Sequence, residues 1–199
     1  MKYIRIIFLF VSVSSVPMYA QSVSSDDFKT EIIKFSSRVS SIDCDFVQTK
    51  VSTLLTEAMV STGHMTYRKP GYLEWSYMEP DHFTIIADGD SVSIARGDMI
   101  ETLNGNQSRM ARELTRMIIS NLDGSILTNE KMFKTEFALA GGLIIATLFP
   151  QKRDYKKVWL RLVLFYDQIN KNATRFEMHE SAGDITYITF SNIKYGFSE

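Results

Sequence analysis

Apolar and polar residues alternate with a period of two over much of this sequence from Ile42 onward. This period is typical of β-strands that have one buried and one exposed face. The alternating segments are short, and residue pairs that favour tight turns, such as Asp88-Gly89 and Gly141-Gly142, separate them. Parallel neighbours would need long crossover connections, so the sequence predicts an antiparallel meander.

About ten or eleven strands follow from this alternation, and a sheet of that size can curl on itself. Such a curled sheet encloses more volume than its own side chains readily fill, which favours an internal cavity. The strands are expected at Cys44–Gln48, Met65–Tyr67, Tyr72–Tyr77, Phe83–Ala87, Ser91–Ala95, Met99–Leu103, Met132–Ala140, Leu143–Phe149, Val158–Asp167, Thr174–Glu180 and Ile185–Lys194.

Two segments have helical spacing instead of alternation. A short helical turn is also expected near residues 125–129. Two or three helices are enough to cover one mouth of the sheet, so the predicted fold class is α+β, mainly β. The apolar face of the first helix consists of Phe28, Ile32, Phe35 and Val39, and that of the second consists of Met110, Leu114, Met117 and Ile118.

Residues 1–20 have the organisation of a secretory signal peptide, with a positive start, an apolar run and small residues that end at Ala20. A retained membrane anchor is the alternative interpretation. Cleavage after Ala20 would leave Gln21 first, and residues 21–199 are then expected to form one domain. No cysteine follows the apolar run, so we do not expect the mature chain to carry a lipid itself.

The charge and the cysteine content narrow the classes of partner. Removing Lys2 and Arg5 leaves 20 basic and 23 acidic residues, a net charge of −3. This balance does not favour nucleic acid or an anionic membrane surface as a partner. The sole cysteine, Cys44, cannot form an intramolecular disulfide and is expected to behave as a small buried residue.

The sequence contains no catalytic or metal-binding motif that we recognise. His64, His82 and His179 fall on or beside different predicted strands without metal-ligand spacing, and GxSxG, P-loop and GxGxxG patterns are absent. Asp43 and Asp45 flank Cys44, an arrangement that usually marks a solvated strand face. We therefore expect a protein that is not an enzyme and needs no cofactor or metal; a secreted hydrolase is the least favoured alternative.

An ordered set of residues between about Ile42 and Val92 resembles a known family. In their order and spacing these residues are similar to the LolA family of outer-membrane lipoprotein carriers. The resemblance implies an incomplete antiparallel β-barrel in which helices form a lid over a hydrophobic cavity. The residues are Phe46 and Gln48, Gly63, Lys69-Pro70, Leu73, Trp75, Pro80-Asp81 and Asp88-Gly89.

The resemblance also implies a function. The chain would be a monomeric periplasmic carrier that binds the acyl chains of lipoproteins. It would accept them from an inner-membrane lipoprotein-releasing transporter and pass them to an outer-membrane acceptor. No nucleic acid is expected among its partners.

Alternation and resemblance together predict which side chains line the cavity. Met and Phe line adaptable apolar pockets well, although for any single one of them core packing is the favoured interpretation, so the cavity is predicted from the curled sheet. Met110, Leu114 and Met117 are the predicted lid residues. The predicted acyl-chain cavity consists of Phe46, Met65, Tyr67, Leu73, Trp75, Tyr77, Phe83 and Ile85.

Lys69 is a departure from the family, which usually has Arg before this proline. The resemblance implies a lid latch, in which the basic side chain reaches helix carbonyls when the cavity is empty. Arg offers a planar fork of donors for that purpose, whereas Lys offers one compact charge. The alternative interpretation is a solvated Lys beside a turn proline.

A related binding module of the same fold is the second functional hypothesis. It could be a sensor of stray lipoproteins or a carrier of another acylated product. An outer-membrane acceptor of this fold would need a lipidated cysteine after its signal peptide, where this sequence has Gln21.

Overall fold

The computed structural model describes residues 25–105, 112, 115–120 and 124–198. The predicted signal peptide, residues 1–20, and the predicted lid residues Met110 and Leu114 lie outside these residues. The elements with defined bounds are α1 (Ser25–Arg38), β1 (Val39–Val51), β2 (Met59–Arg68), β3 (Tyr72–Glu79), β4 (Phe83–Asp88), β5 (Ser91–Arg96), β6 (Met99–Thr102), η1 (Ser125–Thr128), β7 (Phe133–Ala140), β8 (Leu143–Pro150), α3 (Arg153–Val158), β9 (Trp159–Asp167), β10 (Ala173–Glu180) and β11 (Ile185–Phe197).

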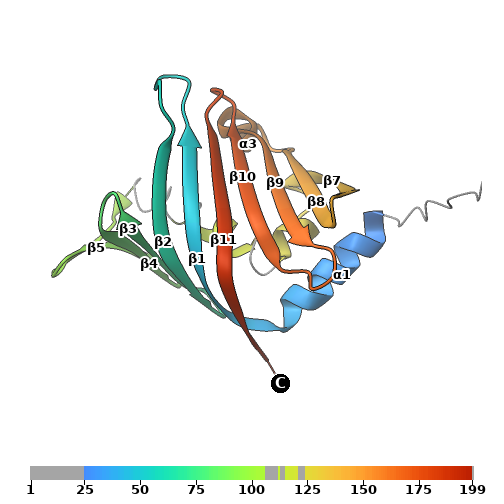
Figure 1. Ribbon diagram of the computed structural model, residues 1–199, viewed down its shortest axis with the longest axis horizontal. Coiled ribbons are helices and arrows are strands. Elements are labelled where there is room, and N and C mark those ends of the chain that lie inside the picture. Colours follow the sequence, from blue (N-terminus) through green and yellow to red (C-terminus); the bar gives the residue numbers. More distant parts are fainter. Residues whose placement is uncertain (1–24, 106–111, 113–114, 121–123, 199) are drawn as a thin grey trace, which may run out of the picture.

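Within the described residues, eleven strands form one antiparallel sheet in the order β6-β5-β4-β3-β2-β1-β11-β10-β9-β8-β7. The predicted fold class is confirmed, because β6 and β7 end this order and leave the sheet open. The prediction of a simple meander, in which each strand pairs with the next one in sequence, is wrong at one place. β1 pairs with the last strand, β11, so two meanders join side by side into the curved sheet of Figure 1.

The chain crosses from one edge of this sheet to the other between β6 and β7. In this connection, residues 115–120 are helical and η1 follows them. Met117, Ile126 and Leu127 are buried there. The connection therefore packs its apolar side chains against the sheet.

Helix α1 lies across one end of the strands (Figure 1). Phe28 and Ile32 are buried, and Phe35 packs edge-to-face on Tyr195 of β11, with ring centroids 5.2 Å apart. The predicted apolar stripe is thus on the buried face of the helix. Its last member was assigned wrongly, because Val39 begins β1, where it is fully buried.

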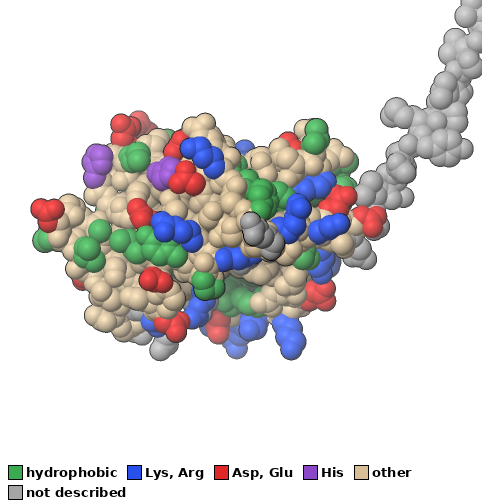
Figure 2. Space-filling model, turned by 90° about the horizontal axis from the view of Figure 1, so that it is seen from below, with side chains coloured by type: hydrophobic (Ala, Val, Ile, Leu, Met, Phe, Trp, Pro, Cys, Tyr) green, Lys and Arg blue, Asp and Glu red, His purple; other side chains and the backbone are tan. Residues whose placement is uncertain are grey.

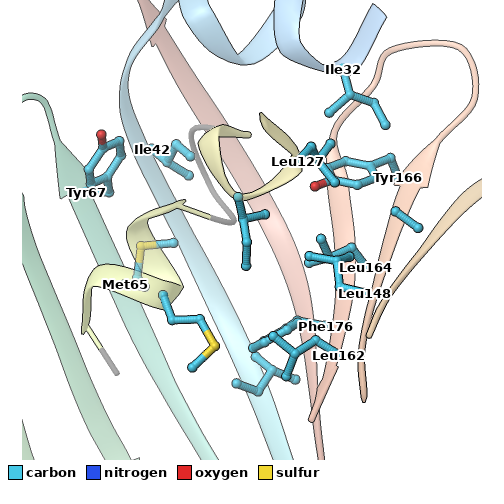
Figure 3. Close-up of a cluster of buried hydrophobic side chains, with 14 of the residues drawn as sticks. Ile32, Ile42, Met65, Tyr67, Leu127, Leu148, Leu162, Leu164, Tyr166 and Phe176 are labelled. Atoms are coloured by element: carbon cyan, nitrogen blue, oxygen red, sulfur yellow. The ribbon is translucent and has the colours of Figure 1, made fainter. Parts of the chain in front are cut away.

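Side chains from the two halves of the sheet meet in the core (Figure 3). Met65 and Tyr67 of β2 approach from one side, and Leu162, Leu164 and others of β9 approach from the other. Leu127 of η1 lies between the two groups in this view. The core therefore depends on the β1–β11 pairing, which sets the two halves around one interior.

Most predicted strands agree with the structure to within one or two residues at the ends, but β1, β2 and β11 extend further than expected. Helix α3 was not predicted, because none of its residues is buried and it carries no apolar stripe. The turn Gly141-Gly142 has positive φ at both residues, 57° and 76°, as a tight hairpin turn requires. No helix in the described part of the chain is long and apolar enough to cross a membrane.

Candidate functional site

An apolar cavity of about 240 Å³ lies between the inner face of the sheet and the helical segment 115–120. Strand pairing brings its wall together, because Trp75 is opposite Ile85, and Gln48 of β1 is opposite Ile188 of β11. The lining residues in the described part of the chain carry no charge. They are Gln48, Leu73, Trp75, Tyr77, Ile85, Ile94, Leu103, Thr115, Met117, Ile118, Phe176, Met178 and Ile188.

The predicted cavity residues all lie on the inner face, but they do not all line this cavity. Leu73, Trp75, Tyr77 and Ile85 do, and so does the predicted lid residue Met117. The remaining four are packed around the cavity: Phe46, Met65 and Tyr67 are fully buried in the core, and Phe83 stacks on Tyr77 with ring centroids 4.5 Å apart. Whether any of them contacts an acyl chain stays a prediction.

Eight of the thirteen residues that line the cavity were not among the predicted cavity or lid residues. Ile94 comes from β5, whose role as a wall strand was not recognised, although its alternation is visible. Phe176, Met178 and Ile188 come from β10 and β11. These strands were predicted, but nothing local in the sequence says that β11 pairs with β1 and so faces the same space.

The polar groups at the cavity are neutral. The Tyr77 hydroxyl donates a hydrogen bond of 3.0 Å to Oε1 of Gln48, and Thr115 is buried beside them. Burial raises the pKa of the Tyr77 hydroxyl above its ordinary value, as an apolar environment does to an acid. The cavity can therefore accept apolar chains and offers a few uncharged hydrogen-bonding groups.

Gly63 has a steric role in the wall. A Cβ at this position would collide with the backbone oxygen of Ser76 and with the ring of Phe46. The absence of a side chain lets the Phe46 ring lie over the strand, where it packs on Trp75 with ring centroids 4.3 Å apart. This explains why a residue without a side chain stands at position 63.

Two more hollows adjoin the helical segment 115–120. One, of about 330 Å³, lies towards η1 and α3 and shares Met117 with the cavity. The other, of about 240 Å³, lies towards the β4–β5 turn and shares Thr115 with it. The segment is therefore bordered by empty space on several sides.

Lys69, the predicted latch, contacts helix carbonyls. Its Nζ donates to the carbonyl oxygens of Ser36 and Ser37, at 3.3 and 2.9 Å, at the C-terminal end of α1. These carbonyls belong to α1 and not to the segment that carries Met117. A solvated Lys without such contacts is thus not what the structure shows, while control of a lid by Lys69 stays a prediction.

The titratable clusters lie on the outer face of the sheet. His64 is held between two carboxylates, with Nδ1 2.8 Å from Asp45 and Nε2 3.1 Å from Asp43. His179 lies 2.8 Å from Glu177, which also pairs with Arg175. Asp43 and Asp45 are partly exposed, as predicted, but their pairing with His64 was missed because it depends on the β1–β2 register.

Neither thiol nor metal chemistry has support in the described residues. Cys44 is buried, as predicted, and burial raises its pKa to about 12, which keeps the thiol protonated and unreactive. No group of three potential ligands is arranged to hold a metal ion within the described ranges.

On the surface seen in Figure 2, basic and acidic side chains are interspersed.

These features define a class of protein: an open antiparallel sheet that encloses an uncharged apolar cavity beneath a helical cover. A family model described as "Outer membrane lipoprotein carrier protein LolA" matches residues 37–197. The chain belongs to the LolA family.

Curated relatives and solved structures are similar to this chain at low identity. An outer-membrane lipoprotein carrier protein of Pseudomonas fluorescens (strain Pf0-1) is 26% identical over 153 residues, 77% of this chain and 71% of the relative. One of Francisella tularensis subsp. tularensis (strain WY96-3418) is 23% identical over 194 residues, 98% of this chain and 87% of the relative. The crystal structure of the Mycobacterium tuberculosis lipoprotein LppX superimposes with a TM-score of 0.47 and 14% identity, covering 88% of this chain and 99% of that one.

Proposed function

We propose that this protein is a periplasmic carrier that holds the acyl chains of lipoproteins in its apolar cavity and moves them from the inner to the outer membrane. The observation that carries this proposal is the uncharged apolar wall beneath the helical segment 115–120. Membership of a family described as lipoprotein carriers supports the choice of cargo.

Acyl chains in water need such a carrier. Each CH₂ group that leaves water contributes about 0.8 kcal/mol. A chain of roughly sixteen carbons therefore costs on the order of 10 kcal/mol when it is exposed, and several chains on one lipoprotein cost several times that. Free diffusion of a lipoprotein through an aqueous compartment is then negligible, and its chains must be covered during transfer.

The cavity must enlarge to accept such cargo. Ligand pockets typically have about 300–1,000 Å³, and the cavity has about 240 Å³. Displacement of segment 115–120 would join it to the two adjoining hollows, with which it shares Met117 and Thr115. A segment that occupies the site when cargo is absent competes with cargo, which weakens net affinity and permits release.

The other parts of the proposal follow from the sequence. A signal peptide at 1–20, cleaved after Ala20, would export the chain to the periplasm. An inner-membrane transporter and an outer-membrane acceptor would load and unload a monomeric carrier. No catalytic step, cofactor or metal is needed, because binding and release are the whole task.

A second candidate is a carrier or sensor for another acylated ligand in the same cavity. The wall would suit it equally, because an apolar surface without charges does not distinguish one acyl chain from another. The identity of the ligand that co-purifies separates the two functions.

Two isoleucines side by side on β4 give the test a matched pair. Ile85 lines the cavity, whereas Ile86 points to the outer face, opposite Glu74 and Ser93; both are half-buried. Ile85→Glu should abolish loading, because a carboxylate in an apolar cavity repels acyl chains. Ile86→Glu should load normally.

The measurement is mass spectrometry of lipoproteins that co-purify with each variant from periplasm, with denaturant unfolding to show that both are folded. Equal loading of the two variants would contradict a cavity-bound ligand. Loading with an acylated molecule other than a lipoprotein would support the second candidate.

A further inference from the structure

The wall of the cavity contains a buried donor that no acceptor in the described part of the chain meets with the geometry of a hydrogen bond. Trp75 is 3% exposed, and its indole Nε1 has no hydrogen-bond partner. The Tyr77 hydroxyl is the polar group beside it: a weak interaction with the Trp75 N–H lowers the pKa of Tyr77 against the larger effect of burial, but it does not meet the geometry of a hydrogen bond. A buried donor without an acceptor is costly, and Trp usually pairs its N–H when it is buried.

The surroundings of this donor select the kind of acceptor that could reach it. The lining residues carry no charge, and their other polar groups are the Tyr77–Gln48 pair and Thr115. Arg175, next to the wall residue Phe176, also borders a much smaller hollow that Trp75 lines, but its guanidinium stacks over Tyr187 at 4.9 Å and pairs with Glu177. A free carboxylate in the cavity would therefore meet no unpaired cation among the described lining residues, and burying it would be very unfavourable.

A neutral carbonyl oxygen fits these conditions. It accepts a hydrogen bond, brings no charge, and is attached directly to an acyl chain in every acyl ester and amide. A plain hydrocarbon chain or an alkyl ether fills the same apolar space but gives Trp75 only a weak acceptor or none.

Resting on the proposed function, we propose that Nε1 of Trp75 donates a hydrogen bond to the carbonyl oxygen of an acyl ester or amide, so that the cavity recognises acylated molecules in preference to free fatty acids and alkyl ethers. The Trp75 donor sets this preference, and the apolar wall supplies most of the affinity. On the same wall the Tyr77 hydroxyl is committed to Oε1 of Gln48, whereas the indole N–H of Trp75 is buried without a partner of good geometry.

The test compares two ligands of equal chain length, dioctanoylglycerol and its dioctyl ether analogue, by calorimetric titration of the mature protein. Trp75→Phe keeps an aromatic ring and removes the donor. It should weaken binding of the diester about two- to tenfold, the effect of one neutral hydrogen bond. Binding of the diether should change by less than about twofold, and free octanoate should bind wild type more weakly than either glyceride.

The second tryptophan provides the control. The chain has two Trp residues, and Trp159 packs on Tyr155 at the start of β9, away from the cavity. Trp159→Phe should leave the affinity for both glycerides unchanged. It also makes Trp75 the sole indole, whose fluorescence should respond more to the diester than to the diether.

The outcomes are distinct. If Trp75→Phe weakens binding of the diester and of the diether equally, Trp75 only packs against the ligand. If it weakens binding of neither, the indole donor is unused. Each of these results overturns the proposal, although the cavity still binds acyl chains. Failure of folded wild type to bind either glyceride would instead overturn the proposed carrier function, and this inference with it.

Discussion

The ammonium group of Lys69 lies 2.9 Å from the carbonyl oxygen of Ser37, in the last turn of α1. A second contact, of 3.3 Å, joins it to the carbonyl of Ser36. Carbonyls in the last turn of a helix have no intrahelical donor, and the negative end of the helix dipole attracts a cation there. Lys69, which follows β2, therefore fastens the end of α1 to the sheet.

Replacing Lys69 by Leu should loosen this junction. The free energy of unfolding should fall by about 1 kcal/mol, a value kept small because the side chain is exposed to solvent. Lys69→Arg should retain most of the stability, since Arg also donates to carbonyls. Urea unfolding of the two variants, with Lys152→Leu on the exposed start of α3 as the control, measures this effect.

The predicted latch role needs a second measurement on the same variants. If closure depends on Lys69, the Leu variant should load lipoprotein and release it slowly to an outer-membrane acceptor, while wild type and the Arg variant release it normally. Equal release by all three proteins would leave Lys69 with a purely structural role at the end of α1.

Gly63 should not tolerate even one additional carbon. Gly63→Ala would place a methyl group against the backbone of Ser76 and the ring of Phe46, so a strand must shift as well as a side chain. Overpacking of this kind costs typically about 1–3 kcal/mol. Gly71→Ala is the matched control, because nothing lies within 4 Å of a Cβ there and its φ is not positive. Unfolding midpoints that fall equally in both variants would contradict the steric role of Gly63.

Local patterns in the sequence were sufficient to predict the strands, the buried face of α1 and the turns. Alternation placed Leu73, Trp75 and Tyr77 on one face, and the structure has them on the inner face. Period and turn chemistry are properties of a few consecutive residues, so a single sequence contains them in full.

Features that depend on distant pairing could not be predicted in this way. The contact between β1 and β11 joins residues more than a hundred positions apart, such as Phe46 and Phe190, and it alone brings Phe176 and Ile188 to the cavity. Helix α3 was missed for a different reason, since it has no buried residue and so no apolar spacing to detect.

The His64 cluster is a further product of the β1–β2 register, and the pKa values of its three groups are shifted. The hydrogen bond to Asp45, followed by that to Asp43, raises the pKa of His64 above its ordinary 6.5. The bond from His64 lowers the pKa of Asp43. A bond from Asn192, followed by that from His64, lowers the pKa of Asp45. Lys194, opposite Asp43 on β11, lowers the pKa of both carboxyls further.

These shifts define the pH range in which the cluster stabilises the fold. A raised pKa means that the folded state holds the His64 proton more tightly than the unfolded state does. The contribution of His64 to the free energy of unfolding is therefore complete below pH 6.5 and is lost as the pH rises through the raised pKa. The carboxyls have lowered pKa values, so their contribution is present above their ordinary 3.8 and is lost as the pH falls through the lowered values. The cluster should therefore stabilise the protein most between about pH 4 and 6.5.

His64→Gln should remove this dependence, because Gln stays neutral at every pH. Wild type should exceed the variant in unfolding free energy at pH 5.5, and the excess should shrink as the pH rises through the raised pKa of His64 and the imidazole loses its proton. Urea unfolding at several pH values measures the difference, and His82→Gln, on the exposed β3–β4 turn, is the control. An excess of wild type over His64→Gln that stays constant from pH 5.5 to 8.5 would mean that the ion pairs of His64 do not stabilise the sheet. In that case the charged imidazole would contribute no more than the neutral one, whose single N–H can donate to only one of the two carboxylates.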